Sequence, residues 1–285
     1  MLLVILFRIC GLVLFLMPAV LRKFLIKKIA VWSMHRGKAK AEVVFQNLKV
    51  VFEYLKKEAP QSADILKVFE TYTRYYFEVL MLPFMSPRFL KKVEVRGLEQ
   101  LQTALQNKKG VIILTSHIGN WDLAGAVMAQ YSPYFGAVAE KLENKALFNF
   151  FTRTRQKKEV NVIASTHSAF RNIKKSLLEK NGQGVVAILA DRDMSGHGVP
   201  VTLFGKPTTI PQGPIEIAKE TGTVLLPGAL YYKGDDCYAK GFGPIIYSQS
   251  DSIEAIAQKV AIGVEKIISE NPTQWCMLQP IWKQL

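Results

Sequence analysis

The chain has 285 residues, of which 37 are lysine or arginine and 23 are aspartate or glutamate, giving a formal charge of 37 − 23 = +14. Hydrophobic residues make up 49 % of it and the mean hydropathy is +0.12, which excludes an intrinsically disordered protein. Three widely spaced cysteines exclude a disulfide-stabilised scaffold, and a chain both this basic and this apolar is typical of a protein that works at an anionic membrane surface.

The first predicted element is an apolar segment over residues 2–21, in which Arg8 is the sole charge and Gly11 and Pro18 are interruptions. Its length is close to the minimum for a transmembrane helix, so a spanning helix is one interpretation. A cleaved signal peptide is disfavoured, because the cations follow the apolar core instead of preceding it. We favour a helix that is embedded in the membrane or lies at its interface.

Seven cations follow this segment before the first acidic residue of the chain. They are Arg22, Lys23, Lys27, Lys28, Arg36, Lys38 and Lys40. Apolar residues recur at helical spacing within the same stretch, which predicts an amphipathic helix on the membrane surface. Because cations beside an apolar segment mark its cytoplasmic side, we expect residues 1–40 to anchor the chain to anionic lipids at the cytoplasmic face of the inner membrane.

Two helices are predicted next, over residues 41–57 and 62–82, from apolar residues at helical spacing. We interpret the aromatic stripe of the second helix as core. From about residue 93, short apolar runs alternate with amphipathic segments. The chain beyond the anchor is therefore predicted to be one domain over 41–285, helical over 41–92 and α/β over 93–285.

The α/β region is predicted to contain strands and helices in alternation. The strands are expected at 111–115, 135–139, 160–164, 185–190, 224–230 and 237–242. The helices are expected at 97–107, 120–130, 143–156, 168–180, 212–221 and 251–269. This alternation indicates a mixed β-sheet flanked by helices.

Residues able to carry chemistry gather where the strand at 111–115 ends. His117 follows this strand, and Gly119 permits a sharp turn before the next helix. Ligands of open α/β sheets bind at the carboxyl ends of strands, so His117 is placed for reaction. Asp122 lies in the first turn of that helix, and we expect its carboxylate to fold back onto one ring nitrogen of His117. The other nitrogen would then act as a general base, without a serine nucleophile.

A second polar group, Asp191-Arg192-Asp193, ends the strand at 185–190. Charges at the end of a buried strand are costly unless they are paired or functional. A D-x-D sequence also occurs in glycosyltransferases, which gives the first alternative: a metal-dependent enzyme that uses a nucleotide sugar. The second alternative is a non-enzymatic basic protein that binds anionic lipids. No nucleic-acid-reading motif, nucleophile elbow, phosphate-binding loop or Cys/His metal spacing occurs, so neither a nucleic-acid partner nor a metal site is expected.

The sequence HIGNWD at 117–122 resembles the H-x4-D/E motif of the lysophospholipid acyltransferase-like superfamily. More narrowly, the chain is similar to the bacterial lipid A biosynthesis (lauroyl/myristoyl) acyltransferase family, which includes phosphatidylinositol mannoside acyltransferases. The similarity continues, in the family's order and spacing, through AEKLENKALFNFFTRTR, ADRDMSGHGVPVTLFGKPTTIPQGP and PTQWCMLQPIW. These blocks are far more specific together than the short motif alone.

The resemblance implies a glycerolipid acyltransferase-like fold and an O-acyltransferase. Such an enzyme moves a fatty acyl chain from acyl-CoA or acyl carrier protein, as co-substrate, to a hydroxyl of a membrane glycolipid. The acceptor implied is a lipid A precursor or a phosphatidylinositol mannoside-like lipid. His117 would be the general base and Asp122 its partner, with no metal, no bound cofactor and no acyl-enzyme.

The same resemblance implies substrate-binding roles for four further residues, which are Glu140, Arg155, Asp191 and Arg192. Glu140 matches an acidic position that lines the acceptor site, and Asp191 is expected to orient acceptor sugar hydroxyls or Arg192. Arg155 matches an arginine of the family. Together with its basic neighbours Arg153, Lys157 and Lys158, it is expected to hold phosphate groups.

Two details of these blocks have consequences for local structure. The family's usual glycine shortly after the matched arginine is Glu159 in this chain, which puts the local turn in question. Glycines at 196, 198 and 205 predict a flexible loop. The apolar residues over 199–204 would line either an acyl-chain groove or ordinary core.

Overall fold

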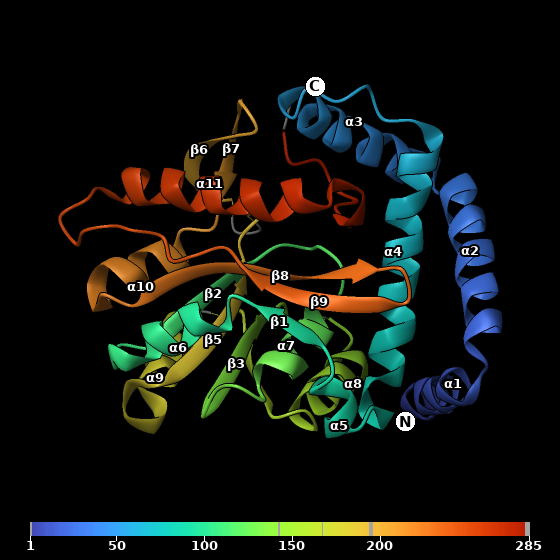
Figure 1. Ribbon diagram of the computed structural model, residues 1–285, viewed down its shortest axis with the longest axis horizontal. Helices are drawn as coiled ribbons and strands as arrows, with labels where there is room; N and C mark the ends of the chain where they lie inside the picture. The colour runs from blue at the N-terminus through green and yellow to red at the C-terminus, as the bar shows by residue number, and fades with distance from the viewer. Residues whose placement is uncertain (1, 142, 167, 194–195, 283–285) are drawn as a thin grey trace.

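The computed structural model describes residues 2–141, 143–166, 168–193 and 196–282 (Figure 1). Within them the α-helices are α1 (Leu2–Leu16), α2 (Ala19–Arg36), α3 (Lys38–Tyr54), α4 (Ser62–Met81), α5 (Pro87–Leu90), α6 (Leu98–Gln106), α7 (Trp121–Met128), α8 (Lys145–Gln156), α9 (Ala169–Gly182), α10 (Gly213–Thr221) and α11 (Ile253–Glu270). The strands are β1 (Glu94–Arg96), β2 (Val111–Thr115), β3 (Tyr134–Ala139), β4 (Val160–Ala164), β5 (Gly184–Leu189), β6 (Val199–Leu203), β7 (Lys206–Ile210), β8 (Val224–Lys233) and β9 (Asp236–Gly241). Two short 3₁₀ helices are η1 (Leu82–Phe84) and η2 (Pro272–Gln274).

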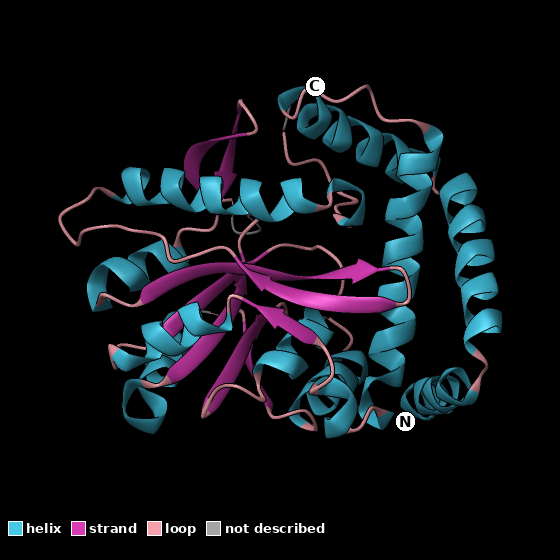
Figure 2. Cartoon of the chain, in the orientation of Figure 1, coloured by secondary structure: helices cyan, strands magenta, loops and turns pink. Residues whose placement is uncertain are grey.

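The main sheet has the strand order β1-β9-β8-β2-β5-β3-β4. Strands β8 and β9 pair antiparallel, and the other neighbours pair parallel. Helices cover both faces of this sheet (Figure 2). The predicted mixed sheet flanked by helices is therefore confirmed, and the six predicted strands match β2, β3, β4, β5, β8 and β9 to within a few residues.

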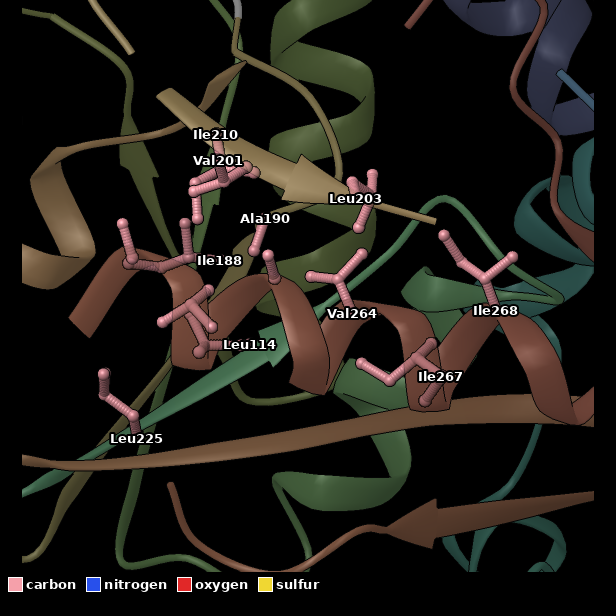
Figure 3. Close-up of a cluster of buried hydrophobic side chains, with 14 of the residues drawn as sticks. Leu114, Ile188, Ala190, Val201, Leu203, Ile210, Leu225, Val264, Ile267 and Ile268 are labelled. Carbon is pink, nitrogen blue, oxygen red and sulfur yellow. The ribbon is translucent and has the colours of Figure 1, made fainter. Parts of the chain in front are cut away.

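The central strand β2 is apolar on both faces because helices cover both. Ile112 and Leu114 face one core, which they share with α9, α10 and α11 (Figure 3). Val111 and Ile113 point the other way, into a core shared with α6 and α7. Burial of each such side chain stabilises the fold by roughly 1.5–3 kcal/mol. These two cores fix the height and direction of the strand that carries His117 at its end.

The segment after β5 differs from the predicted flexible loop. Strands β6 and β7 form an antiparallel hairpin whose two turn residues, Phe204 and Gly205, both have positive φ (50° and 73°). Positive φ at both turn positions matches the right-handed twist of a tight hairpin. Val201 and Leu203 are buried under α11, so this apolar wall belongs to the core.

The N-terminal apolar segment is not one helix. It is broken after α1, and Pro18 caps the start of α2. The 15 residues of α1 extend about 22 Å, against a hydrocarbon core of about 30 Å. None of the helices in the described part of the chain is both long and apolar enough to cross a membrane. The spanning interpretation of residues 2–21 is therefore not supported.

Helix α4 connects the N-terminal helices to the sheet. Helices α1, α2 and α3 pack along it, and α7 packs against its other side. In Figure 1, α4 and α2 run side by side along one edge of the molecule, with the β8–β9 hairpin reaching toward them. The first turn of α4 is fixed by a reciprocal capping box between Gln61 and Asp64.

Candidate active site

The candidate site lies where the parallel strands β2 and β5 end side by side. Their register pairs Thr115 with Leu189, and His117 and Asp191 each lie two residues beyond this pair. The backbone N–H of Ala190 donates to the carbonyl of Thr115 (2.8 Å), which keeps the two chains together past the strand ends. The sheet register therefore brings the histidine and the aspartate into contact.

Asp191 holds His117 through two hydrogen bonds. Its Oδ1 lies 3.0 Å from His117 Nδ1, and its Oδ2 accepts from the His117 backbone N–H (2.8 Å). Oδ2 also accepts from the indole Nε1–H of Trp275 (2.8 Å). Burial alone would raise the pKa of the Asp191 carboxyl, but the attraction of His117 and these hydrogen bonds outweigh it and hold that pKa below its ordinary value.

This contact sets which nitrogen of His117 can act as a base. An ionised carboxylate only accepts hydrogen bonds, so Nδ1 must carry a proton and Nε2 holds the free lone pair of a neutral ring. Nε2 forms no hydrogen bond with the part of the chain that the structure describes. The His117 side chain is 24 % exposed, whereas that of Asp191 is fully buried. The result is a buried anion behind an imidazole that remains open to a substrate.

Backbone contacts hold the loop that carries His117. The N–H of Cys276 donates to the carbonyl of His117 (2.7 Å), and the N–H of Gly119 donates to the carbonyl of Gln274 (3.1 Å). Gly119 has a φ of +58°, and a Cβ there would lie 1.9 Å from the carbonyl oxygen of Leu230. Only glycine fits this close approach. The chain just before the C-terminus therefore fixes the loop from one side and β8 from the other.

The prediction that Asp122 contacts His117 is wrong. Asp122 lies in the first turn of α7 and accepts two hydrogen bonds from Arg155 of α8, at 2.5 Å and 3.2 Å. It also accepts from the hydroxyl of Tyr75 on α4 (2.7 Å). Burial would lower the pKa of the Arg155 guanidinium, but Asp122 outweighs this effect and the pKa is raised. Asp122 thus connects helices α7, α8 and α4. A carboxylate is needed at this position because it balances the charge of Arg155.

An aromatic stack links this ion pair to His117. Trp121 stacks on Tyr75 with ring centroids 3.9 Å apart, and its edge meets the His117 ring at 5.3 Å. Burial, and then the nearby Asp122 charge, raise the pKa of the Tyr75 hydroxyl, which therefore stays protonated as a donor. The two carboxylates are separate centres, since Asp191 bonds to His117 and Asp122 to Arg155 and Tyr75.

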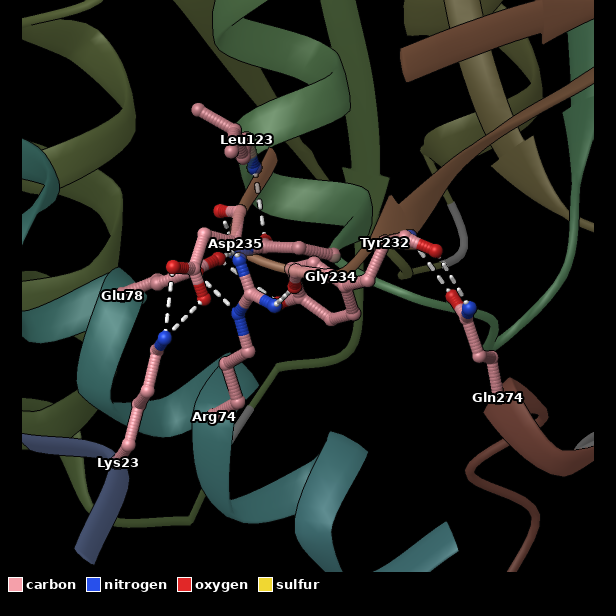
Figure 4. Close-up of polar contacts among 9 residues, drawn as sticks. Lys23, Arg74, Glu78, Leu123, Tyr232, Gly234, Asp235 and Gln274 are labelled. Atoms are coloured by element: carbon pink, nitrogen blue, oxygen red, sulfur yellow. Dashed lines mark hydrogen bonds and ion pairs between the residues drawn. The ribbon is translucent and has the colours of Figure 1, made fainter. Parts of the chain in front are cut away.

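A second ion pair, between the half-buried Arg74 and Glu78 of α4, fixes the start of α7 (Figure 4). Asn120 caps this helix by accepting from the N–H of Leu123 (2.9 Å), and its amide donates to Glu78 of α4 (2.8 Å). Glu78 is held by Arg74 (2.7 Å) and by the hydroxyl of Tyr232 (2.8 Å). Helix α4 therefore orients the residues that directly follow His117.

Helix α4 also holds the tip of the β8–β9 hairpin. The guanidinium of Arg74 donates to the carbonyls of Gly234 and Asp235 (2.7 and 2.8 Å). Lys23 of α2 pairs with the Asp235 carboxylate at 2.6 Å (Figure 4). Gln274 exchanges two hydrogen bonds of 2.8 Å with the backbone of Tyr232 in β8. These contacts connect the N-terminal helices to the loop around His117.

The other predicted site residues lie at the same edge but without contacts to His117. Glu140 is exposed directly after β3, and the register of β3 with β5 places it near the end of the Asp191 strand. Arg192 is half-buried beside Asp191. Both remain candidates for binding a substrate.

The predicted basic cluster at the end of α8 does not act as one group. Arg155 is bound to Asp122, and Lys158 is buried and donates to the carbonyl of Met85 (2.6 Å). Burial lowers the pKa of Lys158. Arg153 and Lys157 remain exposed. Glu159 has a left-handed φ of 61°, which explains in physical terms why the family usually has glycine there.

Trp275, Tyr75 and Glu78 are contacts that the sequence did not single out. The matched tail block contains Trp275, but nothing in it indicates a bond to Asp191. Tyr75 lies on the same helix as the aromatic stripe interpreted as core, but it was not one of the residues of that stripe. The D-x-D alternative is not supported, since Asp191 uses both carboxylate oxygens on His117 and Trp275, and Asp193 accepts from the N–H of Gly198 (2.8 Å).

An apolar cavity of about 60 Å³ begins near the site, between the sheet and helices α6 and α7. Thr115 and Trp121 line it close to His117, and Gly125 and Met128 of α7 line it further along. Its walls are mostly apolar, and Arg96 and Lys240 also line it. His117 itself is not among the lining residues, and the cavity lies between the sheet and α6 and α7.

Comparison with known proteins agrees with this geometry. A phosphatidylinositol mannoside acyltransferase of Mycobacterium tuberculosis (strain CDC 1551 / Oshkosh) is 34 % identical over 220 residues, which cover 75 % of this chain and 68 % of that relative. One of Mycolicibacterium smegmatis is 31 % identical over 220 residues, with coverages of 74 % and 70 %. The sequence profile of bacterial lipid A biosynthesis acyltransferases matches residues 1–284. The chain therefore belongs to the bacterial lipid A biosynthesis acyltransferase family and is an acyltransferase.

Proposed function

We propose that this acyltransferase moves a fatty acyl chain from a thioester, acyl-CoA or acyl carrier protein, to a hydroxyl of a phosphatidylinositol mannoside-like membrane glycolipid. The observation that carries the proposal is the His117–Asp191 pair, with its open Nε2 at the carboxyl ends of β2 and β5. The mannoside-like acceptor is favoured over a lipid A precursor because the relatives at 31–34 % identity are phosphatidylinositol mannoside acyltransferases.

The reaction needs one base and one attacking oxygen. Nε2 of His117 takes the proton of the acceptor hydroxyl while that oxygen attacks the thioester carbonyl. The C–S bond then breaks, and the imidazolium returns the proton to the departing thiolate. The buried Asp191 charge stabilises the imidazolium between these two steps and keeps the Nδ1 proton in place. The products are an ester and a free thiol, with no acyl-enzyme.

The apolar cavity beside Trp121, of about 60 Å³, has room for only a short part of an acyl chain, and we propose that part of the chain enters it. A fatty chain excludes water best against apolar walls, and Trp121, which lines the cavity, contacts the ring of His117 with ring centroids 5.3 Å apart. Met128 lines this cavity on α7. We expect Met128→Ala to shift donor preference toward longer chains, measured by competition among acyl-CoA substrates of graded length.

Exposed apolar side chains support membrane association of α1 and α2. Leu16, Val20 and Trp32 are 72 %, 79 % and 63 % exposed. Lys27 and Lys28 are exposed between them. Exposed apolar side chains on both helices, with exposed cations between them, fit the interface of an anionic bilayer. The proposed location is the cytoplasmic face of the cell membrane.

Mass spectrometry of membrane lipids from a strain lacking the gene tests the whole proposal. We expect a glycolipid to lose one acyl chain, and expression of wild-type protein to restore it. His117→Ala, expressed at the same level, should not restore it. An unchanged lipid profile in the deletion strain, or full restoration by His117→Ala, would overturn the proposal.

A further inference from the structure

A second site lies away from His117, in a groove between α4 and the junction of α2 with α3. We propose that this groove binds the phosphodiester headgroup of an anionic membrane lipid. It is a lipid-binding site distinct from the His117–Asp191 pair, and it does not depend on the role of either residue.

The groove has a volume of about 840 Å³. Its floor is largely aromatic and comes from Phe69, Tyr72 and Tyr76 of α4. The hydroxyls of Tyr72 and Tyr76 share a hydrogen bond of 2.9 Å. Burial raises the pKa of the Tyr72 hydroxyl, so it stays neutral and can donate. Such a floor accepts the apolar faces of a lipid headgroup while offering hydroxyl groups to its oxygens.

The opposite wall is cationic. Arg36, Lys38 and Lys40 line it, together with His35. The first three are exposed, and no ion pair neutralises them within the described part of the chain. Among the lining residues that the structure describes, none is acidic. Unpaired cations around one concave surface favour a phosphate group, which accepts strong charge-assisted hydrogen bonds from arginine and lysine.

The position of the groove identifies the phosphate as that of a lipid. Trp32 and Ile29 line it, and both belong to the exposed apolar surface of α2 (63 % and 39 % exposed). The groove is therefore continuous with the surface proposed to face the bilayer. A lipid whose headgroup lay against Arg36 would keep its acyl chains along Trp32, whereas a free phosphate would leave these apolar side chains in water.

Two aromatic rings, those of Tyr75 and Trp121, connect the groove to the ring of His117. The ring of Tyr72 is parallel to that of Tyr75 at 6.1 Å, and Tyr75 stacks on Trp121. Leu278 lines the groove, two residues after Cys276, whose N–H holds the carbonyl of His117. A lipid held here therefore lies beside the enzyme's chemistry without contacting it.

Calorimetric titration of the full-length protein in non-ionic detergent tests the site. The probe is dihexanoyl phosphatidylglycerol at concentrations where it stays monomeric. The groove variant is Arg36→Ala/Lys38→Ala. The matched control is Lys206→Ala/Lys266→Ala, which removes the same charge from exposed residues of β7 and α11 that do not line the groove. Thermal unfolding of each variant checks that it folds.

We expect the groove variant to weaken lipid binding at least tenfold and the control to change it less than twofold. His117→Ala should bind like wild type, so failure of the proposed chemistry is distinguishable from failure of this site. Dihexanoyl phosphatidylcholine and inorganic phosphate should each bind at least tenfold more weakly than phosphatidylglycerol. The proposal is overturned by no measurable binding, by equal loss in the control, or by inorganic phosphate binding as tightly as the lipid.

Discussion

Two buried carboxylates lie near the loop that carries His117, and their contacts differ. Asp191 ends strand β5 and contacts the ring of His117. Asp122 starts helix α7 and contacts Arg155 and Tyr75. One faces a group that can exchange a proton with substrate, and the other faces a cation that stays charged at all working pH values. The difference teaches that a carboxylate near a histidine in sequence need not be its partner.

The largest effect is expected for His117→Ala, which removes the proposed base that Asp191 holds. We predict a loss of about 10³- to 10⁴-fold in kcat, in the upper range for a general base. The side chain is partly exposed, so stability should change little. Radiolabelled acyl transfer and thermal unfolding measure both quantities. A folded, fully active variant would remove the basis of the comparison.

Asp122→Asn should act on stability, since it leaves the buried Arg155 without a counter-charge. We predict a loss of about 3–5 kcal/mol in the free energy of unfolding, as for broken buried ion pairs. Urea unfolding measures it.

The double variant Asp122→Asn/Arg155→Leu is the matched control. It removes the stranded charge and should recover part of the lost stability. If the single variant unfolded like wild type, the ion pair would not have the structural role assigned to it.

A smaller effect concerns acid stability. The pKa of Asp191 is lower in the folded chain than its ordinary value near 4. Its ionised form therefore stabilises the fold fully above about pH 4–5, and this contribution disappears as the pH falls through the folded pKa. The stability difference between wild type and Asp191→Asn should shrink as the pH falls from about 5 to about 3. Urea unfolding across this range checks it, and a difference that grows on acidification would contradict it.

The smallest effect is expected at Glu159, which lies four residues after Arg155. Its left-handed backbone costs roughly 1 kcal/mol that glycine would avoid, but glycine adds similar entropy to the unfolded chain. We therefore predict that Glu159→Gly changes stability by less than about 1 kcal/mol and leaves transfer activity intact. Thermal unfolding with an activity assay tests this. A large loss of either would mean that the glutamate side chain has a role of its own.

Much of the fold was predictable because its signals are local. The apolar run of β2, the turn at Gly119 and the capped helix after it are all written in neighbouring residues. The β6–β7 hairpin was missed because Gly205, which forms its turn with Phe204, was interpreted as part of a flexible loop. Pro18 marked the break between α1 and α2 in the sequence. That the break leaves α1 too short to cross a membrane became clear only from the length of the helix.

The candidate site was predictable only in part. His117 and Asp191 were both found, since each follows a predicted strand. Their pairing was not, because it depends on β2 and β5 being neighbours in register, which no local pattern encodes. The partner of Asp122 lies 33 residues away on α8, and the contact of Trp275 with Asp191 spans 84 residues.

The central claim is that Asp191 supports the base and Asp122 the fold. Its most direct test is the pH–rate profile of Asp191→Asn beside Asp122→Asn, assayed at low temperature and normalised to folded protein. In Asp191→Asn the introduced amide would donate to Nδ1 of His117 and move the ring proton onto Nε2, so we predict a loss of about 10²- to 10⁴-fold in kcat. Folded Asp122→Asn should keep at least about a tenth of wild-type kcat. Near-normal turnover by Asp191→Asn, with a loss of about 10²-fold or more in folded Asp122→Asn, would contradict the account.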